Sequence, residues 1–170
     1  MEKNIVFIGF MGSGKTTVGR RVAAKLGIDF YDTDEYIKKC EKMTVHDIIK
    51  KKGRKYFEGT ERFAITNLAE NKDCLISTGG NTMLDAQNRE TLKKNGILFW
   101  LRASAQTVYD NTKNSHNKRP EISGASVEDI DAMLKEREPF YRECDVIVDV
   151  DARDMDKIVE TILEEIKQRM

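Results

Sequence analysis

The sequence GFMGSGKTT, residues 9–17, follows the apolar run NIVFI at 4–8 and precedes VGRRVAAKLG at 18–27. Its first eight residues fit the pattern G-x-x-x-x-G-K-[ST], in which a glycine-rich loop joins a strand to a helix. Glycines let backbone N–H groups converge on phosphate oxygens, because no Cβ stands in the way. The positive end of the following helix faces the same point. The stretch therefore predicts a loop that wraps the phosphates of a nucleoside triphosphate.

Two side chains of this loop carry chemistry of their own. Lys15 supplies a full positive charge that suits the β- and γ-phosphates, and the Thr16 hydroxyl can bind Mg²⁺. The alternative is a glycine-rich turn with an exposed lysine. It is the weaker interpretation, because a chance match to the motif would seldom have a buried strand before it and a helix after it.

Short apolar runs alternate with helical segments along the rest of the chain. The expected strands are 4–8, 28–31, 74–77, 97–101 and 146–150. The expected helices are 15–26, 34–40, 44–51, 55–70, 85–95 with Asp85 as its cap, 104–112, a long helix that Ser126 caps, and 155–169. Apolar strands separated by helices predict an α/β fold: a three-layer, doubly wound sheet of five parallel strands, covered by helices on both faces.

Composition narrows the class of protein. The chain has 170 residues, which favours one domain, and its 29 Lys+Arg balance its 29 Asp+Glu. A net charge of zero argues against a general nucleic-acid or membrane-surface binder, which would need a basic excess. The three cysteines show no metal-binding or disulfide spacing, and neither a signal peptide nor a membrane-length apolar run is readable. These features favour a protein of the reducing cytoplasm.

Two further stretches follow predicted strands, as the phosphate loop does. DTD at 32–34 ends the second strand, and STGG at 77–80 follows the third. Ligands of a doubly wound sheet bind beyond the carboxyl ends of its strands, so the three stretches predict one site. One carboxylate of DTD can face the metal while the other accepts a hydrogen bond from an acceptor hydroxyl. Taken alone, DTD would more often be a helix cap beside a solvated acid, and the glycine pair a plain loop.

The isolated arginines and histidines carry little signal by themselves. Arg119 lies in a polar stretch at 113–125, and Arg137 lies on the long helix, where single arginines are usually solvated. His46 and His116 have no partner pattern and are expected at the surface.

In combination, these motifs resemble the shikimate kinase family. The resemblance rests on GxxGxGKT, DTD, the glycine pair, RP at 119–120 and R-x-P-x-Y at 137–141, and it covers nearly the whole chain in order. It implies the P-loop kinase fold of the nucleoside monophosphate kinases, as a single domain over 1–170, with a mobile lid at about 113–125 and substrate-binding helices at about 34–61. It also implies ATP-dependent, Mg²⁺-dependent phosphorylation of the 3-hydroxyl of shikimate, in aromatic amino-acid biosynthesis.

The resemblance also implies roles for individual residues. ATP would be held by Gly12, Ser13, Gly14, Lys15, Thr16 and Thr17, with Arg119 on the transferring group and Arg153 near the adenine. Shikimate would be bound by Asp34, Gly79, Gly80 and Arg137, and the catalytic residues would be Lys15, Asp34 as base, and Arg119. Mg²⁺ would be served by Thr16 and Asp32. The implied partners are ATP and a small acceptor, without nucleic acid or membrane, for a cytoplasmic monomer.

The helix after DTD departs from the family pattern G-E-x-x-F-R-x-x-E. Residues 53–61 read GRKYFEGTE, so Glu58 occupies a substrate-binding position where the family has an arginine, and Arg54 replaces a glutamate. Glu58 facing the pocket would repel a carboxylate. In one outcome, Glu58 turns to Arg54 or Arg62, each four residues away. Arg137 then binds the acid alone. In the other, Glu58 lines a pocket for an acceptor that has no carboxylate.

Two smaller departures concern a glycine and the adenine side. Asn81 replaces the third glycine of the family's GGG, and Asp110 or Asn111 stands where an arginine commonly flanks the adenine. Three functions are therefore weighed: a shikimate kinase, a kinase of another small polyhydroxylated metabolite, and a nucleotide-binding module without catalysis. The third is disfavoured, because such a module would need neither the acceptor base Asp34 nor the lid arginine Arg119.

Overall fold

A five-stranded sheet forms the centre of the protein. The computed structural model describes residues 2–113, 121–151 and 153–169. Its strands are β1 (Asn4–Ile8), β2 (Asp29–Asp32), β3 (Cys74–Ser77), β4 (Gly96–Arg102) and β5 (Val146–Asp149). They are ordered β2-β3-β1-β4-β5, and neighbouring strands pair in parallel. The predicted parallel sheet is confirmed, with each strand end within one residue of its expected position.

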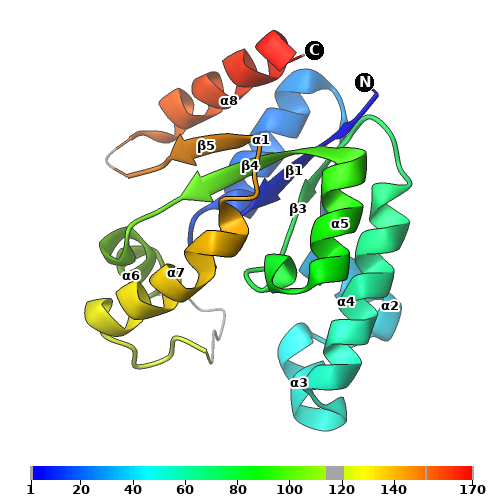
Figure 1. Cartoon of the computed structure of the whole chain (residues 1–170), viewed down its shortest axis with the longest axis vertical. Helices are drawn as coiled ribbons and strands as arrows, with labels where there is room; N and C mark the ends of the chain where they lie inside the picture. Colours follow the sequence, from blue (N-terminus) through cyan, green and yellow to red (C-terminus); the bar gives the residue numbers. More distant parts are fainter. Residues whose placement is uncertain (1, 114–120, 152, 170) are drawn as a thin grey trace.

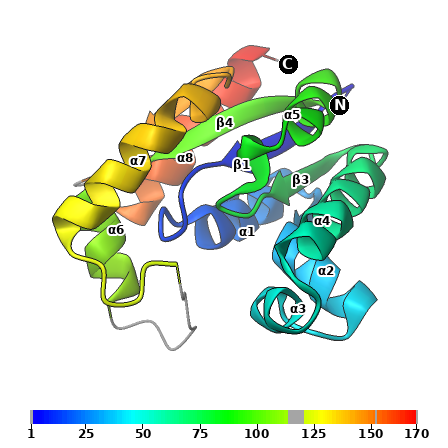
Figure 2. The same cartoon turned by 60° about the horizontal axis from the view of Figure 1, so that its bottom comes forward.

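Helices cover both faces of this sheet (Figures 1 and 2). They are α1 (Lys15–Leu26), α2 (Thr33–Glu41), α3 (Val45–Lys52), α4 (Arg54–Ala69), the short 3₁₀ helix η1 (Thr82–Leu84), α5 (Ala86–Asn95), α6 (Ala105–Thr112), α7 (Val127–Tyr141) and α8 (Met155–Arg169). Helices α1 and α8 lie together on one face, and α4, α5 and α7 lie on the other. The caps predicted at Asp85 and Ser126 are present, because each side chain accepts a backbone hydrogen bond.

The centre of the sheet is more deeply buried than its edges. Every residue of β1 and β3 is buried, as continuous apolar strands between two helix layers should be. In contrast, β5 alternates buried and exposed residues, and no residue of β2 is fully buried. The helix layers therefore cover the middle of the sheet and leave its two edge strands partly open.

Connections from the two central strands leave in opposite directions. The chain runs from β1 through α1 to β2 on one side, and from β3 through α5 to β4 on the other. In doubly wound sheets, ligands bind in the crevice at such a switch point, beyond the carboxyl ends of the strands. The phosphate loop follows β1 and the glycine pair follows β3, so the fold brings both to this crevice.

Candidate active site

The loop between β1 and α1 has a backbone that only glycine adopts easily. Gly9, Gly12 and Gly14 have φ angles of 148°, 77° and 90°. A Cβ on Gly12 would lie 2.6 Å from Cγ2 of Thr112, and one on Gly9 would lie 2.7 Å from the carbonyl oxygen of Leu101. Gly14 is the N-cap of α1 and brings no capping side chain. The first N–H groups of α1 therefore face a loop with room for an anion.

Polar side chains of the loop are buried within it. Lys15 is 7% exposed, and its Nζ donates to the carbonyl oxygens of Gly9 at 2.8 Å and Phe10 at 2.9 Å. The Oγ of Ser13 is buried without a hydrogen-bond partner among the described residues. Thr17 lies at the exposed rim. A buried ammonium group and an unsatisfied hydroxyl among converging amides suit a polyphosphate.

Asp32 joins the phosphate loop to the second strand end. Its Oδ2 accepts a hydrogen bond of 2.7 Å from the Thr16 hydroxyl, and its Oδ1 accepts one of 3.0 Å from the N–H of Glu35. The carboxylate is thus the N-cap of α2 and a partner of Thr16 at once, so its capping role is confirmed and its role toward a metal stays a prediction. A hydroxyl and a carboxylate oxygen side by side fit Mg²⁺, which takes few protein ligands and completes its shell with phosphates and water.

A cavity of about 520 Å³ opens beside the phosphate loop. Met11 of the loop lines it, as do Gly79 and Gly80 after β3 and Asp34 from the first turn of α2. A Cβ on Gly80 would lie 3.2 Å from the backbone nitrogen of Met11, and one on Gly79 would lie 3.1 Å from Oδ1 of Asp34. The glycine pair therefore lets the phosphate loop and the acid of DTD approach the same space.

Glu61 is a second acid in this cavity, and it is almost fully buried, at 4% exposed. The Thr82 hydroxyl donates to its Oε2 at 3.0 Å, and Nδ2 of Asn88 donates to its Oε1 at 3.4 Å. Burial raises the pKa of Glu61 to about 7, and the nearby carboxylate of Asp34 adds to the rise, although the Thr82 hydrogen bond opposes it. The cavity thus holds an acid that is partly protonated near neutral pH.

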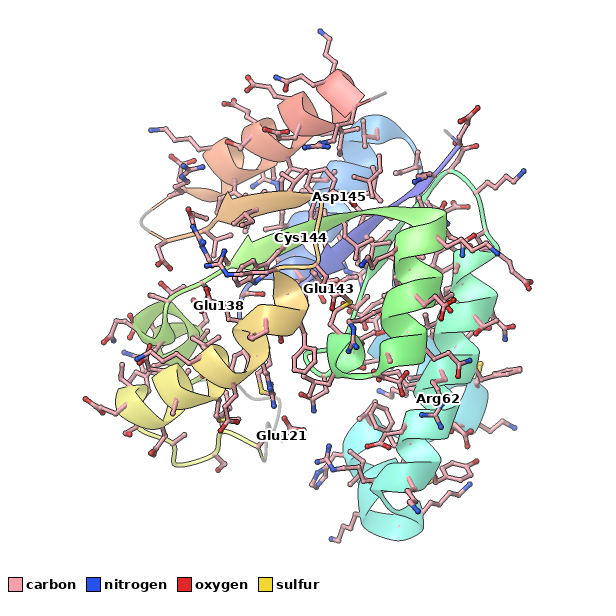
Figure 3. The ribbon with its side chains drawn as sticks, in the orientation of Figure 1. Arg62, Glu121, Glu138, Glu143, Cys144 and Asp145 are labelled. Carbon is pink, nitrogen blue, oxygen red and sulfur yellow. The ribbon has the colours of Figure 1, made fainter. Side chains whose placement is uncertain are left out.

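Two arginines lie close to Glu121, a further acid that lines the cavity. Arg137 of α7 is 12% exposed on its side chain and stacks over the ring of Phe10, 4.7 Å from its centroid. Its Nη2 lies 3.6 Å from Oε2 of Glu121, and Nη2 of Arg54 lies 3.6 Å from Oε1 of the same carboxylate. Nδ2 of Asn81 donates to that Oε1 at 3.0 Å. Figure 3 shows Glu121 between α7 and the α3–α4 pair.

Several predicted residues lie away from this cavity or outside the described chain. Glu58 is exposed and is not among the described residues that line the cavity. The arginines that could have paired with it have other partners, since Arg62 pairs with Asp85 at 2.8 Å and Arg54 with Glu121. Arg153 is exposed. The predicted residues Arg119 and His116 lie outside the described residues.

Other cavity residues were not assigned a role from the sequence. Arg54 and Glu61 were noted only for the altered helix motif, although their spacing with Phe57 places all three on one helix face. His46 was expected at the surface. It is exposed, and it also lines the cavity with Lys50, one turn later on α3.

Comparisons with known proteins agree with this geometry. A family model described as shikimate kinase matches residues 11–167. The shikimate kinase of Thermoanaerobacter pseudethanolicus is 38% identical over 161 residues, which cover 95% of this chain and 94% of that protein. A solved shikimate kinase from Acinetobacter baumannii, in complex with shikimate, aligns with a TM-score of 0.88 and 30% identity, over 98% and 94% of the two chains. The one from Bacteroides thetaiotaomicron gives 0.88 and 27%, over 97% and 98%.

Proposed function

The chain belongs to the shikimate kinase family, and we propose that it transfers the γ-phosphate of ATP to the 3-hydroxyl of shikimate. The products are shikimate 3-phosphate and ADP. One observation supports the proposal most directly. The cavity is lined by Met11 of the phosphate loop, by the acid Asp34 and by the basic residue Arg54. Asp34 can accept a hydrogen bond from a substrate hydroxyl, and Arg54 can bind a substrate carboxylate, beside the loop that would hold the phosphates.

Positioning and charge account for most of phosphoryl-transfer catalysis. We assign the ATP phosphates to the N–H groups of Gly12–Thr17 and to the ammonium group of Lys15, which is already buried in the loop. Thr16 and Asp32, joined by their hydrogen bond, would hold Mg²⁺, which when bound offsets part of the phosphate charge. By the family pattern, Arg119 would contact the transferring phosphoryl group and Arg153 would lie near the adenine.

Asp34 is the proposed base. It reaches the cavity from the first turn of α2, and Gly79 leaves room beside its carboxylate. A hydrogen bond from the 3-hydroxyl to Asp34 would aim the attacking oxygen and provide a place for its proton. Arg137 and the glycine pair would hold the rest of the acceptor. Gly79 and Gly80 line the cavity, and Arg137 contacts Glu121, which also lines it.

The position of Glu58 favours a carboxylate acceptor over a neutral polyol. Because Glu58 replaces an arginine, the alternative is an acceptor without a carboxylate. Among the described residues, however, Glu58 does not line the cavity, whereas Arg54, one turn earlier on the same helix, does. A guanidinium group matches a carboxylate in charge and geometry.

The setting of the enzyme also belongs to this proposal. We place it in the cytoplasm as a monomer of one domain, acting in aromatic amino-acid biosynthesis. No helix in the described part of the chain is both long and apolar enough to cross a membrane.

An acceptor screen coupled to ADP release tests the function. Turnover is expected with shikimate and not with simple sugars. Asp34→Asn should lower kcat by about 10²–10⁴-fold while the Kd for Mg–ATP stays within about twofold, because the amide cannot accept the proton. Asp131→Asn, on a surface aspartate that pairs with Lys135, is the matched control. Turnover only with neutral polyols would contradict shikimate as the acceptor. Tight ATP binding without any turnover would contradict the kinase activity.

A further inference from the structure

The carboxylate of Glu121 lies between two arginines, Arg54 of the cavity lining and Arg137 of α7. Each oxygen of Glu121 faces a different guanidinium: Oε1 lies 3.6 Å from Arg54 Nη2, and Oε2 lies 3.6 Å from Arg137 Nη2. Asn81 adds a hydrogen bond of 3.0 Å to Oε1. These three polar side chains come from the start of α4, from the loop after β3 and from α7. The Glu121 carboxylate therefore lies between two cations, in a position that an incoming carboxylate could also take.

The fit of Glu121 to these arginines is loose. Charge-assisted N–H···O hydrogen bonds are about 2.7–2.9 Å long, so at 3.6 Å neither guanidinium forms one with Glu121. Nη1 of Arg137 is buried and has no hydrogen-bond partner among the described residues. A buried donor nitrogen without an acceptor lowers stability. The arginine pair therefore retains donors that a better-placed carboxylate could satisfy.

Glu121 lines the cavity and is also the ion-pair partner of Arg137. Arg54 lines the cavity too, whereas Arg137 is not among the described lining residues. An acceptor carboxylate reaching Arg137 would have to occupy the place of Glu121. Two carboxylates cannot share that place, because like charges at contact distance repel.

The orientation of α4 brings Arg54 to the cavity, close to the carboxylate that also contacts Arg137. Arg54, Phe57 and Glu61, spaced by three and four residues, turn one face of α4 toward the cavity, and Glu58 lies beside that face in solvent. The basic group thus enters the cavity one helical turn earlier than the family pattern would place it.

We propose that Arg54 and Arg137 together form the binding site for the carboxylate of the acceptor, and that Glu121 occupies this site until the acceptor displaces it. This inference rests on the proposed function, since it presumes a carboxylate-bearing acceptor. Arg54 then sets the preference for an acid, and Glu121 weakens its binding by competing for the same donors. The acceptor affinity that is observed is the intrinsic affinity multiplied by the fraction of molecules in which Glu121 has left.

The test compares two acceptors that differ only in charge, shikimate and its methyl ester. Their Kd values are measured by calorimetry with wild type, Arg54→Gln and Glu121→Gln. Arg54→Gln should weaken shikimate binding by about 10–100-fold, the effect of losing a hydrogen bond to a charged group, and leave the ester nearly unchanged. Glu121→Gln should tighten shikimate binding by about threefold to tenfold, because the amide competes less well for the guanidinium groups.

Two control variants and a second substitution of Arg54 separate the loss of this site from a general change in charge. Lys55→Gln and Glu128→Gln remove charges of the same sign from exposed positions away from the cavity and should leave the acid-to-ester ratio unchanged. Arg54→Met keeps the aliphatic stem and should behave as Arg54→Gln does. The inference is overturned if either the Arg54 or the Glu121 variants keep the wild-type ratio of the two Kd values. Wild type without shikimate turnover would instead overturn the proposed function.

Discussion

At the scale of single residues, the buried environment of Glu61 changes its acid–base chemistry. It is 4% exposed, and its pKa rises from an ordinary 4.5 to about 7, mainly through burial. Below pH 4.5 the carboxyl is protonated in both the folded and the unfolded chain. Between pH 4.5 and about 7 the unfolded chain releases the proton while the folded protein keeps it, so stability falls as the pH rises. Above about pH 7 the cost is constant, at about 3 kcal/mol.

Glu61→Gln should therefore flatten this part of the stability profile. The amide cannot ionise, so the free energy of unfolding should fall less between pH 5 and pH 8 in the variant than in wild type, by up to about 3 kcal/mol. Urea unfolding at several pH values measures it, with Glu128→Gln, on an exposed glutamate, as control. Equal pH slopes in wild type and Glu61→Gln would show that Glu61 does not titrate in this range.

At the scale of elements, the phosphate loop depends on a helix far along the chain. The carbonyl oxygen of Gly12 accepts a hydrogen bond of 2.8 Å from Nδ2 of Asn111 on α6. The methyl group of the next residue, Thr112, lies 2.6 Å from the position that a Cβ on Gly12 would take. The loop is thus shaped from both sides, by its own positive φ angles and by α6.

Gly12→Ala should weaken Mg–ATP binding by at least about tenfold, because φ at this position is 77° and the new methyl group would meet Thr112. Adding Thr112→Ser removes the opposing methyl group and keeps the hydroxyl, which donates to the carbonyl oxygen of Val108. The double variant should recover part of the affinity, and the backbone strain should account for the rest. Calorimetry of all three proteins measures the coupling. If the single and double variants lose the same amount of Mg–ATP affinity, contact with α6 does not shape the loop.

At the scale of the whole molecule, the site is built from the ends of separate strands. The loop after β1, the acids after β2 and the glycines after β3 meet at one edge of the sheet, and residues of α3 and α4 line the cavity beside them. A ligand held there touches segments distant in sequence. Its binding energy should therefore stabilise the native fold as a whole.

Saturating Mg–ATP should raise Tm accordingly. At one hundred times Kd the gain is about 2.7 kcal/mol, which for a chain of this size corresponds to about 5–10 °C. Lys15→Met should lose most of the shift, because the buried ammonium group is removed from the phosphate loop. Thermal unfolding with and without the nucleotide measures both. An unchanged Tm in wild type, in a protein that is otherwise folded, would contradict nucleotide binding by the loop.

The sequence by itself determined the elements of the fold and the phosphate loop. Apolar runs, capping residues and glycines act over a few neighbours, so the strands, helix α1 and the caps at Asp85 and Ser126 could be located from local pattern alone. The glycine spacing of residues 9–16 likewise indicates a phosphate-binding loop without reference to the rest of the chain. Thr16, Asp32 and Asp34 could be grouped because the carboxyl ends of parallel strands meet at one edge.

Only the tertiary structure decided which charged side chains line the cavity. Arg54 and Glu58 are four residues apart on one helix, so periodicity cannot say which of them turns to the cavity; the packing of α4 selects Arg54. Glu121 has no local motif, and it reaches the site because the chain returns to Asn81 across 40 residues. Contacts of this kind depend on how elements pack, and packing is a property of the whole chain that no short stretch of residues contains.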